Sequence, residues 1–537
     1  MPVIHCPRPA TSLKEHQFVG IQWMIDREDG GEFCNGGILA DDMGLGKTLQ
    51  TICLLHNSPD TRSTLVVCPS KLVNDWKREL QACGYVCSLL VAGSVWSIPV
   101  RPDTAADRKI VWITSYSKTT LYHEEMAASK FQRIILDEGH AIKNRSTRWL
   151  RLMSIAAEAH SRWILSATPI QNSPGEWKTL CSWLRVVCPM SRLSEVGDVI
   201  MLRRTMDELR EVDDALPPAP IYYQHDLTIP ASSPEGKLFR ALCDQLQDAL
   251  ESRAVKGMIK LVLYQRILQF LVHPQLYIEA MRRALGRGIY ARPDWSEEGG
   301  STKFGACRIE LQKSVDDHVG TIVFCKYRAE IDFVADAAEA MGARVFSVRG
   351  GMSAAAVSAA IAEGKTLCEA GESVVFIVQI ECGGCGLNLQ FCKKVLFLSQ
   401  HWNPAIVHQA VGRAVRIGQE TAVEVHLFRV VDDVLDNIDR RMVQLHLKKI
   451  AGAQEVCSTL FEGFAPLREI PAYTGGIVPT GGSVPTSAPS AASAASAEED
   501  PMEFIVPATS VYAPSVASSG SGSSSFSGSF SGVEDPD

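Results

Sequence analysis

The sequence lacks any run of about 18 consecutive apolar residues, and its first residues, MPVIHCPRPATSLKEH, lack the apolar core of a signal peptide. We therefore expect a soluble, intracellular protein with no membrane partner. The sixteen cysteines are scattered and lack the dense spacing of a secreted disulfide framework, so free thiols in a reducing compartment are expected. What is present is a chain of 537 residues that is 46% apolar, enough for two or three domains with their own cores.

An excess of basic residues is also missing, since the formal net charge is −8. From Ile470 onward there are seven Asp and Glu residues and no Lys or Arg, which leaves −1 for the rest of the chain. A nearly neutral body can still carry a basic groove, because nucleic-acid affinity depends on local Lys and Arg rather than on the total charge. The net charge therefore neither indicates nor excludes a nucleic-acid partner.

Short β-branched apolar runs alternate with helix-compatible stretches in two groups, a pattern typical of α/β folds with buried parallel sheets. The runs lie at 64–69, 109–116, 133–138 and 162–169, and again at 321–327, 343–350, 373–380, 394–400 and 423–430. They predict one α/β lobe over residues 1–214 and a second over 301–464. Residues 215–300 space their apolar positions three and four apart and predict a helical connector. Residues 465–537 form an acidic, Ser/Gly/Ala/Pro-rich tail that is expected to be disordered.

The stretch ILADDMGLGKTLQTI in the first group predicts a strand, a phosphate-binding loop and a helix. Gly44 and Gly46 would let backbone N–H groups approach the phosphates of ATP. Lys47 would reach the β and γ phosphates, and the Thr48 hydroxyl would bind Mg²⁺. The strict motif requires a glycine where Asp41 stands, so a plain glycine-rich turn remains the alternative.

Two further clusters suit nucleotide hydrolysis. In LDEGH, at the end of a predicted strand, Asp137 would hold Mg²⁺ and Glu138 would orient or deprotonate the attacking water. The alternative is an acidic strand end. In HQAVGRAVRIGQ, Arg413 and Arg416 lie three residues apart on one helix face and could reach the γ-phosphate across a cleft. The alternative there is a solvated basic helix face.

The motifs and their order resemble the Swi/Snf family of helicase-related, DNA-dependent ATPases of superfamily two. The resemblance covers residues from about 10 to 455, and within the family it is similar to the branch of helicase-like transcription factor and transcription termination factor. It is carried by KEHQFVGIQWM, DDMGLGKT, VVCPSKLVNDWKREL, ITSY, DEGHAIKN, LSATPIQNSPGEW, MLRRTMDEL, IVFCKY, CGGCGLNLQ, HWNPA and QAVGRAVRIGQ.

The resemblance implies two RecA-like lobes with ATP between them. It adds Gln17, at the adenine-sensing place, and Gly386 to the ATP-binding residues. It also implies candidates for DNA contact or for coupling DNA to hydrolysis, for which capping, turn or packing roles are the alternatives: Ser70, Lys71, Ser115, Asn144, Thr168, Gln171, Asn388 and Trp402. The Arg203 and Arg204 pair in MLRRT either faces phosphate or braces the lobe.

Two departures from the family pattern stand out. Gln379 and Ile380 replace the usual Ser or Thr before the Gly-Gly pair, a change that can weaken coupling, and Ala414-Val415 replaces Ala-His with little expected effect. Related chains often carry a zinc-binding ligase finger between the lobes, but residues 216–320 contain only two cysteines. The one CxxC, which starts at Cys382, has no second pair at metal-ligand spacing, so no zinc is expected.

These observations predict a DNA-dependent ATPase that moves on double-stranded DNA and remodels or displaces bound proteins or transcription machinery. The expected location is the nucleus, or wherever a DNA virus handles its genome. A strand-separating helicase and an ATP-switched, DNA-bound or transcription-complex scaffold remain the alternatives.

Overall fold

The computed structural model describes most of the chain before residue 461. The described residues are 4–30, 34–58, 63–89, 110–252, 257–286, 290, 292–295, 300–383, 387–399, 401–431 and 438–460. The predicted tail, Gly386 and the second cysteine of the CxxC lie outside these residues. None of the described helices has the length and apolar character needed to cross a membrane.

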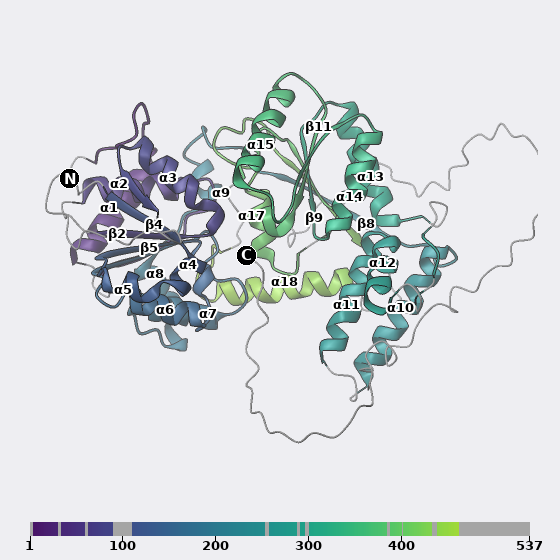
Figure 1. Cartoon of the computed structure of the whole chain (residues 1–537), viewed down its shortest axis with the longest axis horizontal. Helices are drawn as coiled ribbons and strands as arrows, with labels where there is room; N and C mark the ends of the chain where they lie inside the picture. The colour runs from purple at the N-terminus through teal and green to yellow at the C-terminus, as the bar shows by residue number, and fades with distance from the viewer. Residues whose placement is uncertain are drawn as a thin grey trace, which may run out of the picture.

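The first lobe is built on a fully parallel seven-stranded sheet with the strand order β3-β4-β2-β5-β6-β1-β7 (Figure 1). Its strands are β1 Gly36–Leu39, β2 Thr64–Cys68, β3 Val86–Leu89, β4 Ile110–Ser115, β5 Arg133–Asp137, β6 Ser161–Leu165 and β7 Met201–Leu202. The helices are α1 Glu15–Gly30, α2 Lys47–Asn57, α3 Val73–Ala82, α4 Tyr116–Leu121, α5 His123–Ala128, α6 Thr147–Ile155, α7 Pro174–Trp183, α8 Leu193–Ile200 and α9 Met206–Arg210, with short 3₁₀ turns at η1 Ser70–Leu72, η3 Gly139–Ile142 and η4 Met190–Arg192.

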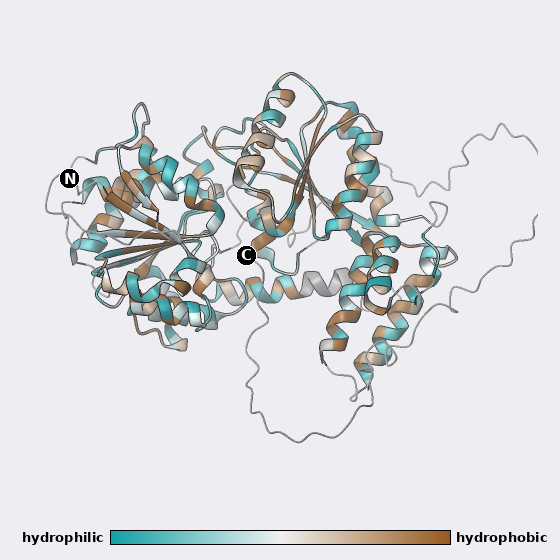
Figure 2. Cartoon of the chain, viewed as in Figure 1, coloured by the Kyte–Doolittle hydropathy of each residue, from teal (hydrophilic) through white to brown (hydrophobic). Residues whose placement is uncertain are grey.

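Alternation along the strands divides the core of this lobe into two layers. Val66 packs with Trp76 and Leu80 of α3 on one face, while Leu65 packs with Leu152 of α6 on the other. Because both faces are covered, the central strands are mainly apolar, and Figure 2 shows much brown on the sheet inside helices of mixed colour. The first group of apolar runs therefore forms the sheet that was predicted.

The second lobe has a six-stranded parallel sheet with the order β10-β11-β9-β12-β13-β8. Its strands are β8 Ile221–Leu227, β9 Thr321–Cys325, β10 Arg344–Val348, β11 Val374–Gln379, β12 Lys394–Phe397 and β13 Glu424–Val430. The covering helices are α13 Thr302–Asp316, α14 Arg328–Ala340, α15 Ala354–Glu369, α16 Ile380–Gly383 and α17 Pro404–Val411. The α/β architecture with two parallel sheets is confirmed.

The connector is helical, but its predicted boundary was wrong at the start. The helices α10 Pro234–Glu251, α11 Gly257–Val272 and α12 Pro274–Leu285 share their own apolar core. Residues 221–227, placed in the connector from sequence, instead form β8 and pair with β13 along its whole length. The sequence IYYQHDL is partly polar because β8 is an edge strand, so it lacks the continuous apolar character of the other strands.

The last described helix, α18 Ile438–Gln454, returns the chain from the second lobe to the first (Figure 1). Its Gly452 lies beside Pro174 of α7, and Val456 lies beside Gly197 of α8. Buried Ile450, Val456 and Leu460 belong to an apolar cluster that includes residues of both lobes. The two lobes are therefore joined by packing as well as by the connector.

Candidate active site

The predicted phosphate-binding loop joins β1 to α2, and its backbone requires glycine at two places. Gly44 and Gly46 have φ of +86° and +84°, in the left-handed region where a side chain is strained. A Cβ on Gly46 would lie 2.5 Å from Nε2 of Gln17. That same Nε2 donates to the Leu45 carbonyl oxygen at 3.3 Å, so Gln17 of α1 lies against the loop, as the resemblance implies.

Lys47 begins α2, with Thr48 next to it, and its amine is held over the loop. The Nζ donates to the carbonyl oxygens of Asp41 at 2.6 Å and Asp42 at 3.1 Å. Burial lowers the pKa of Lys47, while the nearby carboxylate of Glu138 opposes that shift. The loop lysine and the acidic strand end are therefore close enough to act on one ligand.

The Arg203 and Arg204 pair braces the loop. Nε of Arg204 donates to Oδ1 of Asp41 at 2.9 Å, and Gln50 donates to Oδ2 of the same carboxylate at 3.0 Å. Nη2 of Arg203 donates to Oδ1 of Asp42 at 2.8 Å, and the backbone N–H of Met206 reaches Oδ2. Asp41, fully buried where a glycine was expected, is thus an anchor for the loop.

The acidic strand end presents two carboxylates with different environments. Oδ2 of Asp137 accepts from Nε1 of Trp76 at 2.7 Å, and burial together with Glu138 raises the pKa of Asp137 to about 6. Glu138 has φ of +50°, and its Oε2 lies 3.2 Å from Nδ1 of His140. Burial alone would raise the pKa of Glu138, but His140, Lys47 and Arg413 together hold it below its usual value. Glu138 is therefore ionised near neutral pH, and Asp137 takes up a proton only as the pH falls to about 6.

The two arginines of the second lobe reach this centre from the chain after α17, which ends at Val411, so the prediction that they share a helix face was wrong. Arg413 is buried, and its charge acts on Glu138. Burial and the neighbouring Arg413 lower the pKa of Arg416 to about 9, while Glu138 acts in the opposite direction. A Cβ on Gly44 would lie 3.6 Å from Cα of Arg416, which places this residue against the loop. The structure therefore brings both arginines to the glycine loop and the acids of the other lobe.

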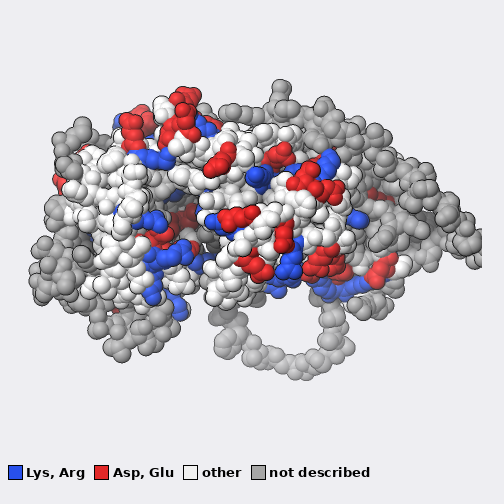
Figure 3. Space-filling view, turned by 90° about the horizontal axis from the view of Figure 1, so that it is seen from above, with Lys and Arg blue, Asp and Glu red and all other residues white. Residues whose placement is uncertain are grey.

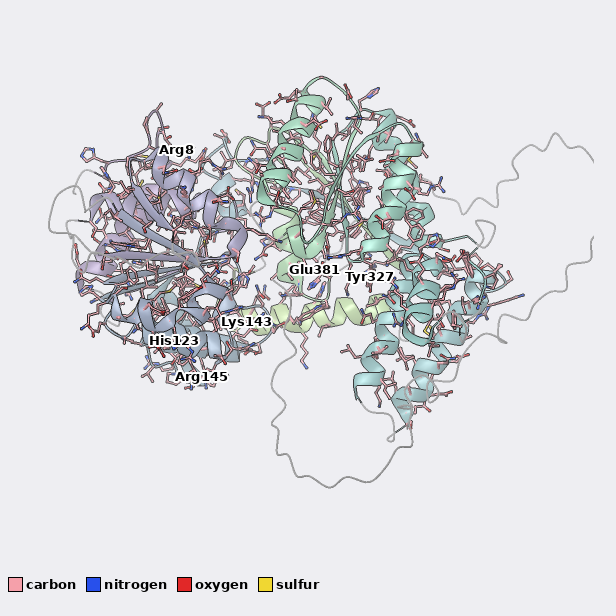
Figure 4. All side chains as sticks on the ribbon, in the orientation of Figure 1. Arg8, His123, Lys143, Arg145, Tyr327 and Glu381 are labelled. Carbon is pink, nitrogen blue, oxygen red and sulfur yellow. The ribbon has the colours of Figure 1, made fainter. Side chains whose placement is uncertain are left out.

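Four buried side chains join the lobes beside the centre. Nε2 of Gln409 donates to Oγ1 of Thr168 at 3.4 Å, and Nδ2 of Asn403 donates to Oε1 of Gln171 at 3.1 Å. Lys143 also donates to Oε1 of Gln171, at 2.9 Å. In Figure 4 Lys143 lies on the first-lobe side of this junction, near α18, and the labelled Glu381 lies on the second-lobe side.

The remaining DNA-contact candidates divide into exposed and structural positions. Lys71 and Asn388 are exposed and line a cavity of about 520 Å³ between the lobes, and Ser70 is exposed next to it in sequence. Asn144 is exposed just after η3. The charged residues that line the cavity are Lys71, Asp75, Arg78, Arg349 and Lys365.

Two candidates have the structural roles that were the alternatives. Ser115 caps α4, since its Oγ accepts from the Lys118 backbone N–H at 3.4 Å. The Trp402 ring lies 3.8 Å from Nζ of Lys449 of α18, which also donates to the Trp402 carbonyl oxygen. Ser115 is thus a helix cap, and Trp402 packs on Lys449 while staying 44% exposed, so the DNA-contact assignment of both remains a prediction.

The family departures are accommodated by packing. Gln379 accepts from the Gly350 backbone N–H at 3.0 Å, and Ile380, Ala414 and Val415 are buried.

Sequence reasoning did not single out Trp76, His140, Asn403 or Gln409. Each lies within a quoted motif. The contacts of Trp76, Asn403 and Gln409 come from distant segments and have no sequence signal, whereas His140 contacts Glu138 two residues away.

Two parallel-sheet lobes that contribute a glycine loop, two acids and two arginines to one centre define a helicase-related ATPase. Family models agree: residues 16–191 match the SNF2-related domain, and residues 303–418 match the helicase conserved C-terminal domain. The chain belongs to the Snf2 family of superfamily two and is a DNA-dependent ATPase.

The chain is also similar to individual proteins and to a solved structure. The chain is 28% identical over 480 residues to the "Probable global transactivator" of Orgyia pseudotsugata multicapsid polyhedrosis virus, covering 83% of this chain and 92% of the relative. It is 28% identical to a Bacillus subtilis (strain 168) protein whose name marks it as a proposed ATP-dependent helicase/translocase, YwqA, with 80% of this chain but only 47% of the relative covered. The Sulfolobus solfataricus SWI2/SNF2 ATPase core, solved in complex with double-stranded DNA, aligns with 87% of this chain and 99% of its own at 20% identity and a TM-score of 0.36.

Proposed function

We propose that this ATPase moves along double-stranded DNA and displaces or remodels proteins bound to it. The observation that carries the proposal is the division of the centre between lobes: Lys47 and Glu138 lie in one, and Arg413 and Arg416 in the other. Hydrolysis that needs both halves requires the lobes to meet, so turnover is linked to relative movement of the lobes.

Within the centre we assign each residue a role. Gln17, which lies beside the glycine loop, contacts the adenine, and Lys47 binds the β and γ phosphates. Thr48 and Asp137 would hold Mg²⁺, which neutralises phosphate charge when bound. Glu138 orients or deprotonates the attacking water, and the two arginines stabilise charge on the γ-phosphate. Oxygen donors at Thr48 and Asp137 suit this hard cation.

The proposed DNA surface is the cavity between the lobes. Four of the five charged residues that line it are basic, and these four come from both lobes. Positive charge on both lobes would attract the negatively charged phosphates of the DNA backbone. Over the described residues of the face in Figure 3, acidic and basic side chains are interspersed, so we expect local contacts rather than a broad basic surface. Lys71, Asn388 and Ser70 are the proposed backbone contacts, with Asn144 a further exposed candidate.

The cross-lobe pairs explain how the two sites can be coupled. Thr168 with Gln409, and Gln171 with Asn403, must shift or break when the lobes move apart. A duplex held by both lobes would favour one lobe arrangement and thereby the assembled centre. A nuclear or viral genome-handling location follows from this substrate and is part of the proposal.

The test measures ATPase rate with no nucleic acid, duplex DNA, single-stranded DNA and RNA, using Glu138→Gln as the blank. Duplex stimulation followed by ATP-dependent displacement of a third strand from a triplex supports translocation. Unwinding of a forked duplex would indicate the helicase instead. Nucleotide-dependent DNA binding without displacement would indicate the scaffold and overturn the proposal.

A further inference from the structure

Two histidines and a glutamate meet in the second lobe, where β8 pairs with β13 and α13 covers the sheet. His225 of β8, His426 of β13 and Glu310 of α13 are only 4%, 2% and 1% exposed. The register pairs His225 with Phe428, two residues from His426, so both histidines point to the same face of the sheet. None of the three belongs to the nucleotide centre or to the quoted family motifs.

The potential ligand atoms converge. One atom from each residue lies within 4.8 Å of the other two. Nε2 of His225 lies 2.9 Å from Nδ1 of His426, which is 3.8 Å from Oε2 of Glu310. Nitrogen and oxygen ligands about 2.0 to 2.1 Å from a tetrahedral zinc ion lie roughly 3.3 Å apart. The two measured distances differ from this spacing by about 0.5 Å or less, so the histidine pair and Glu310 lie close to a metal-binding geometry.

The hydrogen bond between the two rings leaves two carboxylates facing imidazole nitrogens. In the first tautomer His225 donates to Nδ1 of His426, which also lies 3.8 Å from Oε2 of Glu310. In the second tautomer His426 donates, and its Nε2 lies 3.5 Å from Oε2 of Glu424. A cation among these groups, either a proton that charges His426 or a metal ion, would offset the charge of the buried carboxylate.

Neighbouring groups suit a metal site. In the first tautomer Nε2–H of His426 faces Glu424, the orienting carboxylate that metal-bound histidines commonly have. Oε1 of Glu310 is held by Nζ of Lys313 at 2.8 Å, which leaves Oε2 toward the histidines.

We propose that His225, Glu310 and His426 bind one divalent transition-metal ion of the zinc class. Two imidazoles and one carboxylate favour such a metal over Mg²⁺. The ion would fasten β8, the edge strand that leads into the connector, to β13 and α13. The cysteine spacing that argues against a zinc finger has no bearing on this site, because no cysteine contributes to it.

The experiment compares metal content and thermal unfolding of the full chain after chelation and Zn²⁺ addition. The variants are His225→Gln, His426→Gln and Glu310→Gln. The control is His273→Asn, which removes another partly buried imidazole and keeps an N-cap side chain at α12. We expect the unchanged chain and the control each to retain about one more Zn²⁺ than any of the three variants. We also expect Zn²⁺ to raise the Tm of the unchanged chain and of the control, but not the Tm of the variants.

Any Zn²⁺ held by the cysteine thiols should be present equally in the unchanged chain, the variants and the control. It therefore does not affect the difference in metal content between them. Equal metal content and equal Tm shifts in the unchanged chain and the variants would overturn the proposal. If the variants fail to fold, Co²⁺ added to the unchanged chain decides instead. The site is supported if Co²⁺ gives the visible absorption of a tetrahedral ion without a near-ultraviolet thiolate band. The proposal is refuted if that visible absorption is missing.

Discussion

Replacing Arg204 with Met tests whether this arginine braces the glycine loop or faces phosphate. Asp41 is fully buried, and the substitution leaves its carboxylate with Gln50 as the remaining side-chain donor. Removing one partner of a buried ion pair costs about 3–5 kcal/mol. At roughly 2–4 °C per kcal/mol for a lobe of this size, the Tm of the first lobe should fall by about 6–20 °C.

The assay is thermal unfolding followed by tryptophan fluorescence, since eight of the ten tryptophans precede residue 215. The double variant Asp41→Asn/Arg204→Met removes both charges and should recover much of the lost Tm, together with binding of a fluorescent ATP analogue. If Arg204→Met instead kept its Tm but lost nucleotide affinity, and the double variant did not regain it, Arg204 would face phosphate and the brace would be refuted.

Three other outcomes test the centre. Glu138→Gln should lower the ATPase rate by at least about 100-fold while nucleotide binding persists; unchanged turnover would contradict its role. Gln409→Ala should reduce stimulation by duplex DNA more than the basal ATPase rate, and an unchanged ratio would sink the coupling assignment. Because the pKa of Asp137 is about 6, Mg²⁺-dependent activity should fall as pH drops through 6 in a pH–rate profile at fixed Mg²⁺.

The same carboxyl group affects stability with a definite sign. Its folded pKa is raised, so this group favours the fold most below its unfolded value of about 3.9 and loses that contribution as pH rises through 6. In the absence of Mg²⁺, Asp137→Asn should therefore raise Tm at pH 8 and change it little at pH 3. A Tm difference independent of pH would contradict this account, and circular dichroism at the two pH values measures it.

The strands predicted from sequence are those whose two faces are both covered. Residues 64–69 and 321–327, for example, are continuous apolar runs because helices pack on each side of β2 and β9. The edge strands β3 and β7 were not predicted, and β8 was assigned to the connector. The strands β3 and β7 have only four and two residues, and β8 is partly exposed and polar, so each carries a weak periodic signal. The edge strand β10 was predicted because its sequence is more continuously apolar.

Local motifs predicted much of the candidate site, because Gly44, Gly46 and Lys47 act within one turn of chain. Pairings between distant segments were not predictable in the same way. Asp41 and Arg204 are 163 residues apart, and Thr168 and Gln409 are 241 apart. Neither spacing implies contact, since the partners meet only after two sheets have formed and packed.

Arg203 links the glycine loop to the far end of α18. Its guanidinium donates to Asp42 at 2.8 Å and also to the Thr459 carbonyl oxygen, at 3.2 Å from Nη2. The chain reaches Thr459 only after α18 has crossed from the second lobe. The loop therefore contacts the second lobe directly through Arg416 and is tied to its C-terminal extension through Arg203. A change in lobe position must alter one of these contacts, which gives the glycine loop a mechanical connection to the lobe movement that the proposed translocation would require.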